Sequence, residues 1–524
     1  MRPRFLVCVL IALIALVASG LARASNGYGT AVDDRVAAAA DADPVKTDYL
    51  NLLVTGSDPG RAVQAVKGVN LVSLGGTTVS AQVQIRYLAQ LDADTRVSFI
   101  GPDLPSYPTG TLSTAAGQGV AYATLDGANA AWAAGYDGSG VGIAILDSGV
   151  TPSSAFGTRL TQVPVSKGQD MTDYYGHGTF MAGVAAGRDD AGWFAGVAPG
   201  ARILSFKVSN DTGARTKDLI TALNWITGDA NKSGYNIRVI VISATETSPT
   251  SFEGSLLDAA IEHAWRRGYV VVVASGNLGP GAQFFAPAND PFPIVVGALD
   301  DPMSSVTAFS SSGTTPDGYA RPDVLAPGRH IVSLLSSNSV LGGQAPSANL
   351  VAQGYGMGNG TSFAAPQVAG AAAILLQSNP SLTPDEVKWL LTTTGRSVTG
   401  ASANALDISA ALAYTGPIGS ANQGIPMGNC TNTAKDDPCN SNGAAYLNYF
   451  DWTVATTANQ QAVAAAQTYN PSATSSTAST WNASATWNAS ATWNASATWN
   501  ASATWNASAT WNASATWNAA TAWN

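Results

Sequence analysis

Charged residues are scarce in this chain. They make up 11% of the 524 residues, the formal net charge is −9, and no cluster of lysine and arginine stands out. Proteins that bind nucleic acid concentrate positive charge on one face, because the phosphate backbone supplies much of their affinity. The composition therefore argues against nucleic acid as a partner.

Cysteine and histidine are also rare, with three of each in the whole sequence. Cys8 lies in an apolar leader, which leaves Cys430 and Cys439 as an even pair. In an exported chain we expect these two to form one disulfide, and two free thiols are the alternative. No Cys/His cluster has the spacing of metal ligands, so a zinc site is not supported.

Long apolar runs are absent except at the N-terminus. A basic start, Met1-Arg2-Pro3-Arg4, precedes the apolar residues 5–18, and Ala22-Arg23-Ala24 offers a cleavage site. This pattern predicts a signal peptide over residues 1–24. The run is short for a bilayer span, which needs about 20 apolar residues, although an N-terminal anchor helix is the alternative. We expect a secreted chain without a transmembrane segment after processing.

One serine stands out among what is present. Gly358-Asn359-Gly360-Thr361-Ser362 runs directly into residues 365–376, a small and apolar stretch that predicts a buried helix. A hydroxyl at a helix N-terminus lies among backbone N–H groups that favour negative charge. The alternative is an ordinary N-cap serine.

An aspartate and a histidine supply the groups that such a serine needs. Asp147 ends the apolar run 141–146, which predicts a buried strand, and His177 lies between two glycines at the head of another small-residue helix. His263 looks like an ordinary helix-end residue, and His330 follows a turn. A serine hydroxyl becomes a useful nucleophile when a histidine takes its proton and a carboxylate orients that histidine.

The motifs around these residues resemble those of the subtilisin-like serine proteases, the subtilases. The resemblance covers roughly residues 115–412. It rests on four segments: Ile145-Leu146-Asp147-Ser148-Gly149, His177-Gly178-Thr179, Val272-Val273-Ala274-Ser275-Gly276-Asn277 and Gly360-Thr361-Ser362-Phe363-Ala364-Ala365-Pro366.

The resemblance implies a role for each residue. Ser362 would attack a peptide carbonyl, His177 would transfer the proton, Asp147 would orient His177, and Asn277 would help to hold the oxyanion. No cofactor is required for this chemistry. Calcium often stabilises the family, but no acidic loop in this sequence supplies an evident ligand set.

The chain departs from the family beside the expected specificity pocket. The resemblance implies that Ser243, Ala244, Thr245 and Gly213 bind the substrate, yet Ala244 and Thr245 replace a leucine and a glycine. Since Thr245 is β-branched where no Cβ is expected, we expect a narrowed pocket that prefers small or medium residues.

Residues 111–415 are predicted to form the catalytic domain, an α/β fold with a mostly parallel sheet flanked by helices. Strand-like and helix-like segments alternate, as this class requires. The strands are expected at residues 239–242, 270–274 and 294–296, and the helices at residues 216–227, 255–267 and from Thr383 to Gly395.

Residues 25–110 have a different character and are predicted to form a small α+β propeptide. Residues 49–54 alternate like a strand, 58–66 suggest a short helix, and 96–103 resemble the closing strand of an inhibitor-type propeptide. A removable template suits a slowly folding parallel sheet and could block the cleft until it is cut away. We expect cleavage between Asp103 and Gly119, with a permanent N-terminal domain as the alternative.

The C-terminal part is polar and then repetitive. Residues 416–470 are predicted to be a linker that carries the disulfide, and 471–524 repeat a Thr-Trp-Asn-Ala-Ser-Ala hexapeptide. An even step of six places each Trp on one face of an extended strand, so a β form is favoured over a helix. The tail could bind a cell-surface polymer or its own copies, and a low-complexity tail without a role is the alternative.

Two functions from different classes follow. The first is a secreted serine endopeptidase that is made as a precursor and acts on protein and peptide substrates. The second is a non-catalytic adhesin whose Trp repeat does the binding. The four intact residues Asp147, His177, Asn277 and Ser362 favour the endopeptidase, with retention at the cell surface through the repeat as a variant of it.

Overall fold

The structure is a computed structural model. The predicted signal segment, the cysteine pair and the Trp-repeat tail lie outside the residues that it describes. Those residues are 28, 31–43, 45–108, 110–112, 122–189, 194–210, 213–228, 234–248, 250–300, 303–344, 350–425 and 427. The chain divides into two compact units, one formed by residues 1–105, 247–259 and 427–523 and the other by residues 106–246 and 260–426.

The first unit contains a four-stranded antiparallel sheet in the order β2-β3-β1-β4. Its buried core is made of aliphatic side chains such as Leu52, Val54 and Ile100. The elements are α2 (Asp34–Ala42), β1 (Tyr49–Gly56), α3 (Pro59–Ala65), β2 (Val69–Gly75), β3 (Thr78–Gln84), η1 (Ile85–Tyr87), α4 (Leu88–Asp92) and β4 (Val97–Pro102).

The predicted strand 49–54 and helix 58–66 correspond to β1 and α3. Helix α3 starts where it does because the Asp58 side chain accepts a hydrogen bond from the Arg61 N–H, and Pro59 occupies the first turn. Proline is tolerated there since the first N–H groups of a helix have no partner within it. The domain boundaries at 24/25 and 110/111 remain predictions.

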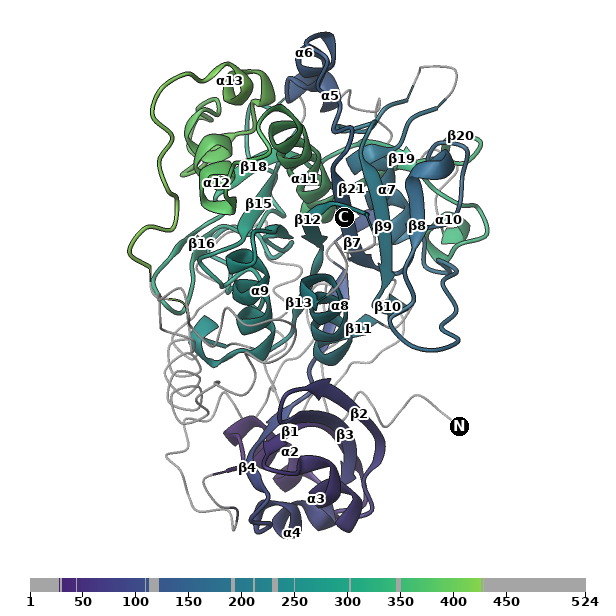
Figure 1. Cartoon of the computed structure of the whole chain (residues 1–524), viewed down its shortest axis with the longest axis vertical. Helices are drawn as coiled ribbons and strands as arrows, with labels where there is room; N and C mark the ends of the chain where they lie inside the picture. The colour runs from purple at the N-terminus through teal and green to yellow at the C-terminus, as the bar shows by residue number, and fades with distance from the viewer. Residues whose placement is uncertain are drawn as a thin grey trace, which may run out of the picture. The chain divides into compact units, whose positions relative to one another are not determined.

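The second unit is built on an eight-stranded sheet in the order β22-β18-β15-β14-β12-β7-β9-β8, and the labelled strands from β18 to β8 follow one another across Figure 1. All of its neighbouring strands pair in parallel. The predicted α/β fold with a parallel sheet flanked by helices is therefore confirmed. The strands are β7 (Gly142–Asp147), β8 (Leu160–Gln162), β9 (Arg202–Lys207), β12 (Ile237–Ile242), β14 (Val270–Ala274), β15 (Ile294–Leu299), β18 (Val324–Pro327) and β22 (Asn404–Ala405).

The helices bury small or apolar faces. Helices α7 (His177–Ala186) and α11 (Thr361–Ser378) pack against each other and against the central strands. Helix α12 (Pro384–Thr393) begins at a capping box in which Thr383 and Glu386 bind each other's backbone N–H. The other helices are α5 (Tyr122–Leu125), α6 (Ala128–Ala133), η2 (Gly157–Arg159), α8 (Thr216–Gly228), η4 (Phe252–Gly254), α9 (Leu256–Arg266), α10 (Val340–Gln344) and α13 (Ile408–Ala413).

Short antiparallel strands form the remaining sheets. One sheet has the order β10-β11-β5-β13, another the order β19-β21-β20 with β6 paired to β21, and a third joins β16 to β17. These strands are β5 (Pro105–Pro108), β6 (Gly110–Leu112), β10 (Ser209–Asn210), β11 (Gly213–Arg215), β13 (Ala244–Glu246), β16 (Gly313–Thr314), β17 (Ala320–Arg321), β19 (Ile331–Leu334), β20 (Leu350–Ala352) and β21 (Tyr355–Gly360).

Candidate active site

The candidate site lies at the carboxyl ends of two neighbouring central strands. Asp147 is the last residue of β7, and β7 pairs with β12 so that Leu146 is opposite Ile242. From this pair the strand order runs outward through β9 and β8 on one side and through β14, β15 and β18 on the other. Parallel α/β sheets place their sites where the strand order reverses.

Asp147 and His177 are in direct contact. His177 Nδ1 lies 2.9 Å from each carboxylate oxygen of Asp147, and both side chains are buried. Asp147 also accepts the Ser148 N–H at 2.7 Å. His177 is the first residue of α7, after Gly176 with a left-handed φ of 94°, a conformation that glycine adopts without strain. The turn thus aims the imidazole back at the strand end.

Ser362 is the second residue of α11, and the residue that precedes the helix as its N-cap is Gly360. The helix begins at Thr361, four residues before the predicted apolar stretch, so Ser362 is not an N-cap serine. Its N–H belongs to the first turn, where backbone N–H groups have no partner within the helix. Its hydroxyl donates to the Ser243 carbonyl at 3.4 Å, next to the end of β12.

A proline in the same helix affects the Ser362 carbonyl. Pro366 has no N–H, so it cannot donate to the carbonyl four residues earlier, which belongs to Ser362. The Ser243 hydroxyl donates to that carbonyl at 3.4 Å. Ser243 and Ser362 are therefore joined by two reciprocal, long hydrogen bonds.

The ring of His177 packs close to the serine helix. Its centroid lies 5.5 Å from that of Phe363, the residue after Ser362. The Nε2 atom of His177 is buried and has no hydrogen-bond partner among the residues that the structure describes. That atom is the basic nitrogen of the ring when Nδ1 donates to Asp147.

Asn277 is held by the residue before the serine. Its side-chain oxygen accepts both the N–H and the hydroxyl of Thr361, each at 3.0 Å. The Thr361 hydroxyl also accepts the Gly276 N–H at 3.2 Å. Because the oxygen is occupied, the NH2 group is the end of the Asn277 amide that is left to donate to a ligand.

Three of the four predicted substrate-binding residues lie on two strands of one small sheet, and the fourth lies directly before one of these strands. Gly213 begins β11, Ala244 and Thr245 belong to β13, and Ser243 precedes β13. Strand β5 lies between β11 and β13 and pairs with both. The four residues are thereby gathered around one extended segment of the chain itself.

Sequence reasoning missed Asp173. This buried carboxylate accepts four hydrogen bonds: from the Ser148 hydroxyl, the Gly176 N–H, and the N–H and hydroxyl of Thr179. The Ser148 hydroxyl in turn accepts the Gly178 N–H at 3.0 Å. Asp173 thus ties the start of α7 to the residue that follows Asp147. The sequence signal that could have identified it is an acid four residues before the glycine-flanked His177.

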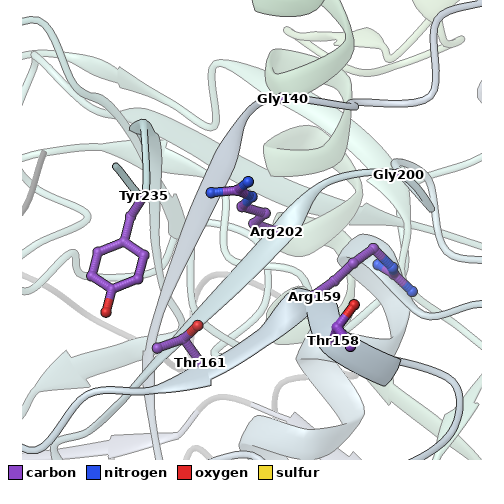
Figure 2. A pocket seen from close by; sticks show the side chains of 7 residues that line it. All are labelled: Gly140, Thr158, Arg159, Thr161, Gly200, Arg202 and Tyr235. Carbon is purple, nitrogen blue, oxygen red and sulfur yellow. The ribbon is translucent and has the colours of Figure 1, made fainter. Parts of the chain in front are cut away.

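A cavity of about 340 Å³ lies at the other end of the sheet, near the starts of β7, β9 and β12. Figure 2 shows the residues that line it, which include Arg159 and Arg202. The Arg159 guanidinium donates to the carbonyls of Ala155, Ala186 and Ala201, so its role is to hold loops together. The lining residues are Gly140, Thr158, Arg159, Thr161, Gly200, Arg202 and Tyr235.

The residue pattern of the subtilase family (Peptidase S8) matches residues 138–407 of the chain. This stretch includes the three motif residues Asp147, His177 and Ser362. The chain therefore belongs to the subtilase family, as its motifs predicted.

Known relatives agree with this assignment. The chain is 37% identical over 269 residues to serine protease AprX of Bacillus subtilis strain 168, which covers 48% of this chain and 61% of AprX. It is 32% identical over 267 residues to subtilisin DY of Bacillus licheniformis, which covers 50% of this chain and 86% of that protein. These relatives support the prediction of a subtilisin-type serine endopeptidase.

A solved structure shares the fold. The crystal structure of fervidolysin from Fervidobacterium pennivorans, described as a keratinolytic enzyme related to subtilisin, matches with a TM-score of 0.57 at 22% identity. The match covers 77% of this chain and 65% of fervidolysin, so both AprX and fervidolysin are matched over less than two thirds of their length. In the described part of the chain, no helix is long and apolar enough to cross a membrane.

Proposed function

We propose that this chain is a secreted serine endopeptidase that becomes active when its N-terminal segment, residues 25–110, is removed. The observation that supports this most strongly is the contact between both Asp147 oxygens and His177 Nδ1, with Ser362 beside the neighbouring strand end. A buried carboxylate that fixes the histidine tautomer leaves Nε2 to act as the base.

The proposed reaction assigns one role to each of these residues. A substrate carbonyl is attacked by the Ser362 oxygen while His177 Nε2 takes the hydroxyl proton. The negative oxygen of the tetrahedral intermediate is stabilised by the Asn277 NH2 group and the Ser362 N–H. His177 then protonates the leaving amine, and water releases the acyl group by the same steps in reverse. This proposal needs no cofactor for the chemistry.

The substrates are proteins and peptides bound as an extended strand. The edges of β11 and β13 supply backbone groups for such a strand, with Gly213, Ala244 and Thr245 along it. Thr245 carries a Cβ and a methyl group at the position that we assign to the specificity pocket. We therefore propose that small or medium side chains are accepted there more readily than Phe or Tyr.

We also propose roles for the N-terminal and C-terminal segments. We propose that residues 1–24 direct export, that Cys430 and Cys439 form a disulfide in the exported chain, and that the repeat over 471–524 retains part of it at the cell surface or promotes self-association. The regular Trp spacing supports the last point, since it places one aromatic face on an extended strand. Deleting residues 471–524 and measuring surface retention tests this, and unchanged release contradicts it.

A casein or peptide-library digestion tests the central proposal. The purified, processed chain should cleave internal peptide bonds, and the Ser362→Ala variant should be inactive while it keeps the same far-ultraviolet circular dichroism. A well-folded and processed wild-type sample that cleaves no peptide in the library contradicts the proposed function.

A further inference from the structure

Strand β5 fills the space between β11 and β13, which we call the slot and to which we assign the substrate strand. It pairs with both flanking strands. Its register with β13 is antiparallel and places Ser106 opposite Glu246 and Tyr107 opposite Thr245. The register therefore identifies the residue of β13 that faces each position of an extended chain in the slot.

A carboxylate lines the slot at the position of Ser106. Glu246 is buried, and its Oε1 atom accepts the hydroxyl of Thr216 at 2.5 Å. Thr216 directly follows β11 and Glu246 ends β13, so this bond joins the two sides of the slot. Neighbouring strands lie about 4.8 Å apart, so a bond between these two side chains crosses the middle strand on one of its faces.

The side chain of Ser106 lies on that same face. Residues directly opposite each other in an antiparallel pair place their side chains on one face of the sheet, with Cβ atoms about 5 Å apart. Ser106 is buried, yet its hydroxyl has no hydrogen-bond partner among the residues that the structure describes. The short serine side chain therefore does not use the carboxylate beside it, and a longer donor at this position can reach it.

We propose that Glu246 selects substrates that carry lysine or arginine at the position of Ser106. This inference rests on the proposed function and adds a second specificity determinant to Thr245. Lysine carries its ammonium on a flexible four-carbon stem, and the arginine guanidinium matches the geometry of a carboxylate. A carboxylate accepts several hydrogen bonds, so it can bind a cationic donor while it holds Thr216, and charge-assisted bonds are the stronger ones.

The register places the selected residue fourth before the cut bond. The Ser362 hydroxyl donates to the carbonyl of Ser243, so we assign the attacked carbonyl to the substrate residue opposite Ser243. Glu246 is three residues further along, about 10 Å away on an extended strand, and the antiparallel register runs toward the substrate N-terminus. Because side chains alternate along a strand, Glu246 and Thr245 lie on opposite faces, and the two preferences should be independent.

A purely structural role for Glu246 is the competing explanation, because its bond to Thr216 joins β13 to the start of α8. Two substitutions separate these roles. In Glu246→Gln the amide oxygen can still accept the Thr216 hydroxyl, but the charge is gone. Thr216→Val does the reverse, since it removes the bond and keeps the carboxylate.

A series of peptides tests the selection. Internally quenched peptides differ only in the fourth residue before a single cut bond, which is Lys, Arg, Ser, Leu or Glu, and mass spectrometry of the products verifies the bond. We expect kcat/KM of the processed enzyme to be at least about tenfold higher for Lys or Arg than for Leu, the scale of a hydrogen bond to a charged group, and lowest for Glu. Equal values for Lys and Leu, or a preference for Ser or Leu, overturn the inference.

Variants test whether the carboxylate causes the preference. Glu246→Gln should bring the ratio of kcat/KM for Lys to that for Leu close to one, whereas Thr216→Val should keep the wild-type ratio. Asp218→Asn is the matched control, because it removes an acid near the same helix start that pairs with Lys217 at 2.6 Å, and it should also keep the ratio. Melting temperature and circular dichroism show whether each variant is folded. A folded Glu246→Gln enzyme with the wild-type ratio overturns the inference.

The Leu peptide and a fluorophosphonate probe separate the two levels of failure. If Ser362 is labelled and the Leu peptide is cut as fast as the Lys peptide, the selection by Glu246 is wrong and the proposed function stands. If the folded, processed chain is not labelled and cuts no peptide of the series, both are wrong.

Discussion

Thr361 holds the side-chain oxygen of Asn277 through two hydrogen bonds, one from its N–H and one from its hydroxyl, each 3.0 Å long. The residue next to the proposed nucleophile thus orients the amide that is proposed to bind the oxyanion. The two bonds couple the start of α11 to the Asn277 side chain.

This contact predicts the effect of two substitutions. Asn277→Ala should lower kcat by about 100- to 1,000-fold, the range found for the equivalent type of donor in subtilisin itself, with little change in KM. Thr361→Val removes one of the two bonds and should lower kcat by about tenfold, since one lost hydrogen bond is worth on the order of 1 kcal/mol. Steady-state kinetics on one peptide substrate measure both. Equal kcat in Asn277→Ala and wild type contradicts the role.

Asp147→Asn should reduce turnover by about 10⁴-fold, the scale of a wrong histidine tautomer in a serine protease. The amide cannot accept the Nδ1 proton with its NH2 end, so His177 no longer presents a basic Nε2. The loss should appear in kcat, measured in single-turnover experiments, with a melting temperature close to that of wild type. A variant that keeps more than a tenth of wild-type kcat contradicts the assignment.

Asp173→Asn should lower both the melting temperature and kcat, because Asp173 holds the start of α7 beside the residue that follows Asp147. The substitution weakens a buried acceptor of four hydrogen bonds that joins Ser148, Gly176 and Thr179. Bonds to a charged acceptor are worth about 1.5–3 kcal/mol each, so a lower melting temperature is expected. We expect kcat to fall with KM nearly unchanged, and slower fluorophosphonate labelling of Ser362. Asp170→Asn, at an exposed acid in the same loop, is the matched control.

Thr245→Gly should widen the proposed specificity pocket. Removing the Cβ and its branches should raise kcat/KM for Phe and Tyr substrates relative to Ala and Thr substrates by about tenfold or more, the scale of a single methylene group in a pocket. Thr245→Ser removes only the methyl group, so its ratio of kcat/KM values should lie between those of wild type and Thr245→Gly. If Phe or Tyr already dominates the cleavage profile of the wild-type enzyme, Thr245 does not narrow the pocket and the prediction is wrong.

Asp126 predicts a pH dependence of stability. Its side chain is fully buried, accepts the Ala128 N–H at 3.1 Å, and burial raises its pKa from 3.8 to about 8. An acid whose pKa is raised in the folded state contributes stability below its unfolded pKa, and this is lost as pH rises through the folded pKa. We therefore expect stability from this group to fall between about pH 4 and 8.

Asp126→Asn should remove that fall. Melting temperatures from pH 4 to 9, measured in the Ser362→Ala background to prevent self-digestion, provide the test. The variant should show a shallower decline than its parent over this window. If the melting temperatures of the two proteins decline equally with pH, the result contradicts a buried, neutral Asp126.

Much of the fold was predictable because buried parallel strands have a strong local signal. The run before Asp147 is apolar on both faces, and β14 has the predicted bounds of Val270–Ala274. The helix that carries Ser362 begins four residues earlier than its apolar stretch indicates. Its first turn is determined by Gly360 and by the bonds from Thr361 to Asn277, which are distant in sequence.

The parts that could not be predicted depend on non-local partners. Asp173 lies in a polar loop and reads as a solvated acid, yet it is buried by the residues that donate to it. Strands β5 and β6 are three to four residues long, and Pro105 and Pro108 suggest a loop. These segments are strands because they pair with β11, β13 and β21, which are distant from them in sequence.

The most direct test of the central claim is the site of covalent labelling. The processed chain is treated with a fluorophosphonate, digested, and the modified residue is identified by tandem mass spectrometry. We predict one modified serine, Ser362, and loss of labelling in His177→Ala with its fold intact. Labelling of a different serine, or undiminished labelling of folded His177→Ala, contradicts the account.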